Sequence, residues 1–255
     1  MRSGTLWRNS IAEKRVAVPC TATDESPMIG GLIFDLDGVI VDTSEFHYQA
    51  WKRLAAELGI AFTRDDNEKL KGLSRLESLD TILSLANPYN HQTGVAAQSR
   101  KIELAKRKNS WYLEFVRNLA PDDILPGVEN FLVECRQSGI KTAIASSSKN
   151  AKAVIDSLAI SHLFDCIVDG TRVAKAKPNP QIFLIAVKKL NEKPGSCIIL
   201  EDALAGVEAA RLARIRCIGI APEPALLPAD LVIPGFLNFG IKELCSFDRL
   251  IRNPA

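Results

Sequence analysis

A buried strand that runs into two carboxylates is the feature that most constrains this chain. The apolar run Leu32 to Phe34 continues directly into Asp35 and Asp37, and Gly38 follows as a turn residue. Such a run predicts a strand covered on both faces, as in a parallel sheet. Carboxylates at its end are unfavourable without a positive partner, which a divalent cation with oxygen ligands would supply. Because a carboxylate beside a cation can act as a nucleophile, the pattern predicts metal-assisted phosphoryl chemistry.

Composition and charge exclude several partners. The chain has 255 residues, 47% hydrophobic and 24% charged, which is typical of a globular protein with one large domain or two modest ones. Its net charge of +2 gives no reason to expect nucleic acid or an anionic membrane surface as a partner. No apolar run approaches the roughly 18 residues that a membrane-spanning helix needs.

The six cysteines do not form a metal or disulfide pattern. They stand at positions 20, 135, 166, 197, 217 and 245, among apolar neighbours and without a CxxC pair. They are interpreted as small buried hydrophobic residues in a reducing compartment, which favours the cytoplasm.

Residues 1–27 differ from the rest of the chain. They lack the continuous apolar region of a secretory signal and have only a weak basic bias of the kind found in transit peptides. Met28 directly precedes the first expected strand. Residues 1–27 are interpreted as a disordered extension or an artefact of the start site.

Hydrophobic periodicity divides the remainder into two parts. Helical stripes occur over 45–59, 76–85 and 102–116. Beyond the break at Pro121, strands are expected over 142–146, 166–169, 197–201 and 217–220, with helices over 149–158, 180–190 and 203–213. This alternation predicts an α/β fold, a Rossmann-like parallel sheet with helices on both faces. The α/β core comprises 28–42 and 122–255, and a helical cap domain, 43–121, is inserted after the first strand.

Polar residues gather where the expected strands end. These are Asp35 and Asp37, then Ser146 to Asn150 at the start of a helix, then Lys175 and Lys177, and finally Glu201 and Asp202. In an open parallel sheet the carboxyl ends of the strands form the ligand-binding edge. Carboxylates that hold a cation, together with amines and a helix N-terminus that hold a phosphate, are what phosphoryl transfer requires.

These four segments together resemble the haloacid-dehalogenase-like superfamily, and within it the chain is similar to the β-phosphoglucomutases. The resemblance extends from about Leu32 to Leu244. The aspartate pair specifies only the superfamily, whereas segments of the cap domain specify the mutases. Those segments are His47 with Trp51, then 70–75 and 105–109.

The resemblance implies a role for each site residue. Asp35 would be the nucleophile that becomes an aspartyl-phosphate, and Asp37 the general acid/base. Mg²⁺ would be held by Asp35, the backbone carbonyl of Asp37, Glu201 and Asp202. The remaining implied substrate and phosphate residues are Thr43, His47, Trp51, Lys71, Gly72, Arg75, Lys108, Ser146, Ser147, Ser148, Lys149, Asn150 and Lys177. Among them, Ser146 and Lys177 would hold the transferring phosphoryl group.

Elementary chemistry agrees with this division of roles. A mutase binds a bisphosphate intermediate in two orientations, so it needs a second anion site in the cap. Arg75 suits that site because a guanidinium binds phosphate in a bidentate manner. One departure from the family pattern is Gln181, where many relatives carry an acidic residue in the first helical turn. We expect a minor loss of stability from it.

Simpler interpretations stay open for individual residues. The aspartates could cap a helix, Arg75 could be a surface residue, and His47 and Trp51 could belong to the core of the cap. Lys108 stands in a charged run that would also suit a solvated helix face.

The expected activity is the interconversion of β-D-glucose 1-phosphate and glucose 6-phosphate through β-glucose 1,6-bisphosphate. The alternative is a Mg²⁺-dependent phosphatase of small sugar phosphates. A dehalogenase is disfavoured because halide displacement needs no acid/base such as Asp37, and a non-catalytic sensor because no charged site residue is missing. We expect a monomer, because no exposed heptad pattern or long apolar edge is present.

Overall fold

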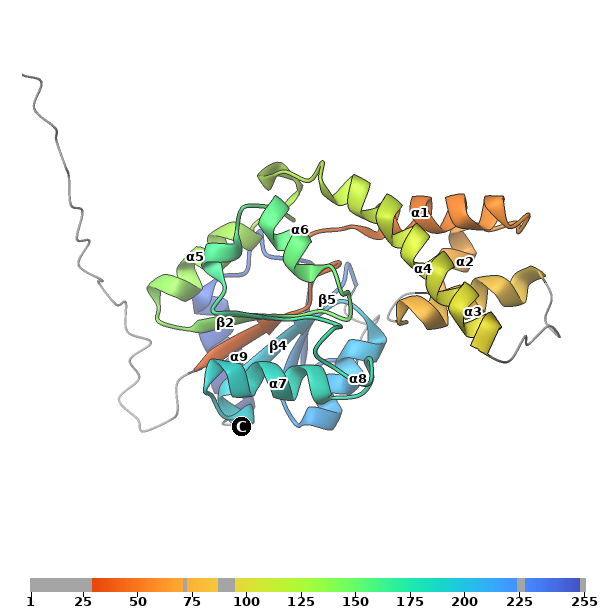
Figure 1. The fold of residues 1–255 in the computed structure, drawn as a ribbon. Helices are drawn as coiled ribbons and strands as arrows, with labels where there is room; N and C mark the ends of the chain where they lie inside the picture. The colour runs from red at the N-terminus through yellow and green to blue at the C-terminus, as the bar shows by residue number, and fades with distance from the viewer. Residues whose placement is uncertain (1–28, 71–72, 87–94, 224–227, 253–255) are drawn as a thin grey trace, which may run out of the picture.

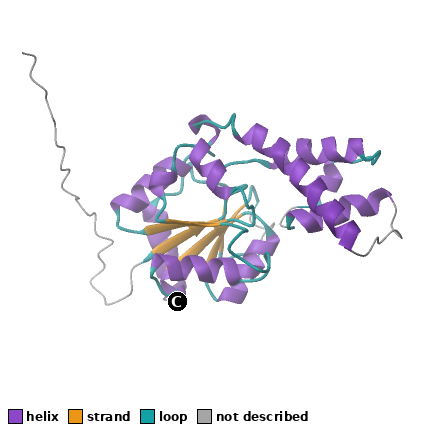
Figure 2. Ribbon diagram, viewed as in Figure 1, coloured by secondary structure: helices purple, strands orange, loops and turns teal. Residues whose placement is uncertain are grey.

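The computed structural model describes residues 29–70, 73–86, 95–223 and 228–252. In this part of the chain, strands form one parallel sheet in the order β3-β2-β1-β4-β5-β6. The strands are β1 (Gly31–Phe34), β2 (Lys141–Ala145), β3 (Cys166–Val168), β4 (Cys197–Glu201), β5 (Arg216–Ile220) and β6 (Leu231–Ile233). The strand that carries the two aspartates at its end, β1, therefore lies in the middle of the sheet (Figures 1 and 2).

Helices cover both faces of the sheet. They are α5 (Val128–Gln137), α6 (Ala151–Ser157), α7 (Gln181–Leu190), α8 (Leu204–Ala213) and α9 (Ile241–Arg252). Side chains of β1 alternate between the two cores: Leu32 and Phe34 pack with α5, α6 and α9, and Ile33 packs with α7 and α8. The alternation follows from the strand period of two, and it explains why every residue of β1 is buried.

A helical part is inserted between β1 and β2. It contains α1 (Ser44–Glu57), α2 (Arg64–Glu68), α3 (Arg75–Ala86) and α4 (Val95–Val116). In Figure 1 these helices, coloured orange to yellow-green, group to one side of the sheet, and α4 packs against both α1 and α3. Three short 3₁₀ helices complete the described elements: η1 (Pro121–Asp123), η2 (Ser161–Leu163) and η3 (Pro194–Ser196).

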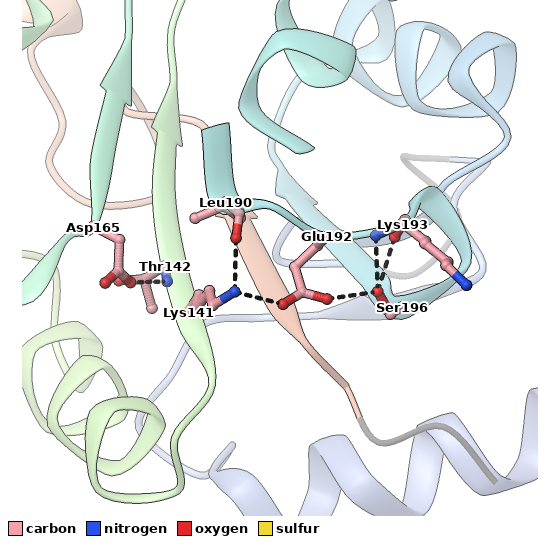
Figure 3. Close-up of polar contacts among 7 residues, drawn as sticks. All are labelled: Lys141, Thr142, Asp165, Leu190, Glu192, Lys193 and Ser196. Carbon is pink, nitrogen blue, oxygen red and sulfur yellow. Dashed lines mark hydrogen bonds and ion pairs between the residues drawn. The ribbon is translucent and has the colours of Figure 1, made fainter. Parts of the chain in front are cut away.

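The amino ends of the strands are joined by a polar network (Figure 3). Lys141 Nζ donates to the carbonyl of Leu190 and to Glu192 Oε1, both at 2.8 Å. Ser196 Oγ donates to Glu192 Oε2 at 3.1 Å. A Cβ at Gly30 would lie 2.3 Å from that carboxylate, so a larger residue there would require the Glu192 side chain to move. The network ties β2 to the segment between α7 and β4, at the opposite end of the sheet from the aspartates.

The expected α/β fold, with its parallel sheet and helices on both faces, is confirmed. The helices and strands expected from periodicity are present with shifts of a few residues at their ends, apart from α4, which begins at Val95. No element had been assigned to the segments that form α2, α5, β6 and α9. The domain boundaries 28–42, 43–121 and 122–255 stay a prediction, and residues 1–27 lie outside the described part of the chain. Among the described helices, none is long and apolar enough to cross a membrane.

Candidate active site

The loop after β1 brings its two aspartates to the carboxyl edge of the sheet. The backbone N–H of Asp35 donates to the carbonyl of Leu200 at 2.9 Å, which extends the ladder with β4 by one residue. Gly38 has φ +80°, and a Cβ there would lie 2.1 Å from Asp202 Oδ2. Glycine is therefore required by both the backbone conformation and the close approach of Asp202. The glycine of the sequence Asp-Leu-Asp-Gly is thus explained by the loop after β4, whose Asp202 packs directly against Gly38.

Lys177 is the buried cation of the site. Its Nζ donates to Asp35 Oδ1 and, at 2.8 Å, to Glu201 Oε2. The side chains of Lys177 and Glu201 are only 4% and 2% exposed. Burial alone would lower the pKa of Lys177, but the charges of the two carboxylates outweigh it and raise the pKa. Lys177 is therefore held as an ammonium ion next to the predicted nucleophile.

Three carboxylates form a candidate metal centre. Ligand oxygens of Asp35, Glu201 and Asp202 lie within 4.8 Å of one another. Burial raises the pKa of Glu201, the ammonium of Lys177 opposes the rise, and the neighbouring carboxylates Asp35 and Asp202 add to it. Three acidic groups against one ammonium leave an excess of negative charge, and hard oxygen ligands suit Mg²⁺. The residues present therefore fit the expected ion.

Serines and a helix start line the edge beside Asp35. Ser146, at the end of β2, is 2% exposed, and its Oγ accepts from the N–H of Ser148 at 3.1 Å. The N–H of Asn150 donates to Ser148 Oγ at 3.2 Å. Ser147 Oγ is buried and has no hydrogen-bond partner among the described residues. This loop leads into α6, so it offers hydroxyl groups and backbone N–H groups where a phosphate would lie.

The loop that carries Lys177 is closed by Gln181. Its Oε1 accepts from the backbone N–H groups of Ala174 at 3.0 Å and Lys175 at 3.4 Å. Asn179 Oδ1 accepts from the N–H of Gln181, the first residue of α7, at 3.1 Å. Gln181 therefore stabilises the loop that carries Lys177. This role could not be predicted from its position in the first turn of a helix.

The helical part contributes a buried basic group. Lys108, on α4, is 2% exposed, and its Nζ lies 2.9 Å from His47 Nδ1 on α1 and 4.6 Å from the centroid of the Trp51 ring. Burial lowers the pKa of both His47 and Lys108, and Arg75 lowers both further. We assign the amine as the donor, which places the proton of a neutral His47 on Nε2. Lys108 is thus not part of a solvated face.

Asp37 is joined to the helical part by hydrogen bonds. Thr43 Oγ1 donates to Asp37 Oδ1 and lies 3.2 Å from the hydroxyl of Tyr112 on α4. Burial raises the pKa of Asp37 to about 6; the bond from Thr43 opposes the rise, and Asp35 adds to it. Two adjacent aspartates in such different surroundings are suited to different roles.

A single cavity of about 430 Å³ joins these groups. The predicted residues that line it are Asp35, Asp37, His47, Trp51, Arg75, Lys108, Ser146, Ser147, Ser148, Lys149, Lys177, Glu201 and Asp202. Thr43 lies behind the wall, bound to Asp37. The side chain of Asn150 is not in the lining, because it donates to Asn109 Oδ1 on α4 at 2.7 Å. Lys71 and Gly72 lie outside the described residues.

Sequence reasoning missed several polar residues at or near the cavity, among them Ser78, Tyr112 and Asn109. Ser78, on α3, lines it and is buried. Tyr112 contacts Thr43, and Asn109 contacts Asn150. The sequence offered a signal only for Asn109, which belongs to the segment 105–109 that resembles the mutases.

Comparison with known proteins agrees with this geometry. A model of the haloacid dehalogenase-like hydrolase family matches residues 29–214. β-Phosphoglucomutase of Bacillus subtilis is 44% identical over 79% of this chain and 88% of its own length. The crystal structure of β-phosphoglucomutase from Clostridium difficile superposes with a TM-score of 0.82 and 38% identity, covering 88% of this chain and 99% of that one. A phosphorylated carbohydrates phosphatase of Thermotoga maritima is 29% identical over 72% of this chain and 81% of its own length.

The parallel sheet with its acidic edge, together with the matching family model, therefore places the chain in the haloacid-dehalogenase-like class. Within that class the chain belongs to the β-phosphoglucomutase family, so the resemblance found in the sequence motifs is confirmed. The expectation of an enzyme rather than a binding module is confirmed with it.

Proposed function

We propose that the chain interconverts β-D-glucose 1-phosphate and glucose 6-phosphate through an aspartyl-phosphate and β-glucose 1,6-bisphosphate. The observation that carries this proposal is the shared cavity, whose lining includes Asp35 and Lys177 from the sheet and Arg75 from α3. A bisphosphate has one reacting and one distal phosphate, and such a cavity offers cationic groups from both parts of the chain.

Asp35 attacks the reacting phosphate and carries it as an aspartyl-phosphate. Lys177, whose Nζ already binds Asp35, neutralises charge on the transferring group, and Ser146 donates to it. Asp37 protonates the departing sugar oxygen and later removes the proton of the attacking hydroxyl. A pKa of about 6 is suitable for a group that serves in both directions near neutral pH.

Asp35, Glu201, Asp202 and the carbonyl of Asp37 would hold Mg²⁺. When bound, the ion supplies positive charge to the transferring phosphoryl group and balances the carboxylates. The serine loop 146–149 and the N-terminus of α6 bind phosphate oxygens. Arg75 binds the distal phosphate, and His47, Trp51 and Lys108 form the wall against which the sugar packs.

The proposal is tested by following two products in one tube. Purified protein is incubated with Mg²⁺, β-glucose 1-phosphate and a trace of the 1,6-bisphosphate, and glucose 6-phosphate and inorganic phosphate are measured. We expect fast formation of glucose 6-phosphate with little free phosphate. Phosphate release without glucose 6-phosphate would contradict the mutase function.

That second outcome would support a Mg²⁺-dependent phosphatase of small sugar phosphates. The relative from Thermotoga maritima, named as a phosphorylated carbohydrates phosphatase, motivates this alternative. The same aspartate pair serves both reactions, which differ in whether water or a sugar hydroxyl attacks the aspartyl-phosphate.

A further inference from the structure

Tyr112 stands behind the acid/base, and the proposed function does not use it. The side chains of Tyr112 and Thr43 are fully buried, with 0% exposure. The phenol oxygen lies 3.2 Å from Thr43 Oγ1, and Thr43 Oγ1 donates to Asp37 Oδ1. Three groups therefore form a line of hydrogen bonds from the last turns of α4 to the carboxylate in the cavity.

The direction of these bonds follows from counting protons. The Thr43 hydroxyl has one proton, and the Asp37 carboxylate accepts it. The contact between Thr43 and Tyr112 can then be made only if the phenol donates and Thr43 Oγ1 accepts. Burial raises the pKa of the Tyr112 phenol, so it keeps its proton. The order is Tyr112 to Thr43 to Asp37.

The phenol ring is fixed by contacts that do not involve its hydroxyl. Its centroid lies 4.3 Å from that of the His47 ring, and Lys108 Nζ lies 4.9 Å from it. These contacts, with complete burial, leave the ring little freedom. The hydroxyl is therefore presented to Thr43 at a defined place, and substitution by phenylalanine removes the donor while it keeps the packing.

We propose that Tyr112 is a positioning residue, which holds the Thr43 hydroxyl and through it orients the Asp37 carboxylate for proton transfer. Thr43 engages one carboxylate oxygen, Oδ1, which leaves Oδ2 for the substrate hydroxyl. The inference rests on the proposed function only in taking Asp37 as the acid/base. A misplaced acid/base is costly, because proton transfer requires hydrogen-bond geometry.

A double-mutant cycle tests whether Tyr112 acts through Thr43. Tyr112→Phe, Thr43→Val and the double variant are compared by kcat and KM. We expect Tyr112→Phe to lower kcat about tenfold with KM nearly unchanged, and to have no further effect when residue 43 is valine. Independent, additive losses would overturn the proposal, and so would an unchanged kcat. Tyr48→Phe is the matched control, since Tyr48 is also buried but stacks on Phe62 away from Asp37.

Two further measurements distinguish a positioning role of Tyr112 from a failure of the proposed mutase function and from a purely structural role. If wild-type protein releases phosphate without isomerising the sugar, the proposed function fails, and the same cycle is read on phosphate release, which also needs Asp37. A crystal structure of Tyr112→Phe gives a readout without turnover. We expect the Asp37 carboxylate in more than one orientation there; a single orientation, unchanged from that of the wild type, would show that the role of Tyr112 is only structural.

Discussion

At the scale of single residues, Lys177 is the residue of the site whose substitution we expect to destabilise the fold most. Its ammonium group is the buried partner of both Asp35 and Glu201. Removing one member of a buried ion pair leaves an uncompensated charge, which costs more than the pair itself contributes.

We predict that Lys177→Ala lowers the free energy of unfolding by about 3 kcal/mol at pH 8, and that millimolar Mg²⁺ recovers part of the loss. Urea unfolding with and without Mg²⁺ measures both effects. Lys175→Ala is the control, because Lys175 is exposed in the same loop. Equal losses for the two variants would mean that the buried pair does not account for the effect.

The residues at strand ends could be predicted, because a carboxylate or lysine that follows an apolar run has no simple role in a core. Asp35, Asp37 and Glu201 gave this signal, whereas Lys177 stands in the loop after β3 and was predicted from the family resemblance; all four meet in the structure. Tyr112 gave none, because a tyrosine within the apolar stripe of a helix has the pattern of ordinary core packing.

At the scale of elements, the loop between β3 and α7 shows how one side chain can organise a segment. Gln181 binds two backbone N–H groups and thereby closes the loop that delivers Lys177. The resemblance had suggested that glutamine here is a small defect of the helix start. The structure shows that the glutamine oxygen accepts two backbone hydrogen bonds. A carboxylate oxygen at the same position could accept the same bonds.

We predict that Gln181→Ala speeds amide hydrogen exchange at Ala174 and Lys175 by about tenfold, the equivalent of one lost hydrogen bond. Gln181→Glu should keep the protection, since it preserves an acceptor. Mass-spectrometric or NMR exchange measures this directly. Similar exchange in the alanine variant and the wild type would show that the loop is closed by other contacts.

The short helix α2 begins with a reciprocal cap that should respond to pH. Asp66 Oδ2 accepts from the N–H and Oγ1 of Thr63, and the N–H of Asp66 donates to Thr63 Oγ1. The Thr63 hydroxyl, followed by Lys69, lowers the pKa of Asp66 to about 2. Because the pKa of Asp66 in the folded protein lies below its ordinary value of 3.8, this cap stabilises α2 above pH 4 and is lost as the pH falls toward 2.

We predict that NMR titration gives Asp66 a pKa near 2 in the wild type and a value shifted toward 3.8 in Thr63→Val. The valine variant removes the hydroxyl but keeps the shape of the side chain. An unshifted pKa in that variant would contradict the assignment of the cap.

Whether an element could be predicted depended on the length of its signal. The stripes of α1 and α4 extend over several helical turns, and β1 and β4 are continuous apolar runs that end at carboxylates. By contrast, β6 has three residues at the edge of the sheet and α2 has five, too few to establish a period. The helix α5 was overlooked although its sequence has the helical spacing Val128, Phe131, Leu132 and Cys135. All four residues are buried, so this helix could have been predicted.

At the scale of the whole molecule, the insertion of helices after β1 brings two differently charged surfaces to one cavity. The sheet supplies the carboxylates and Lys177, and the helical part supplies Arg75 and Lys108. A direct contact, Asn150 to Asn109, joins the start of α6 to α4. Sequence alone could not assign this contact, because the partner of a polar side chain at a helix start depends on how the two parts pack.

Arg75, in this proposal, forms a second anion site in the cavity that holds Asp35. The most direct measurement compares Arg75→Ala with wild type for two phosphoryl donors, β-glucose 1,6-bisphosphate and acetyl phosphate. We predict that the half-saturating concentration rises about 10- to 100-fold for the bisphosphate, as expected for loss of a charge-assisted contact, and stays nearly constant for acetyl phosphate, which has no distal phosphate. An equal change for both donors, or no change for the bisphosphate, would contradict the two-site account.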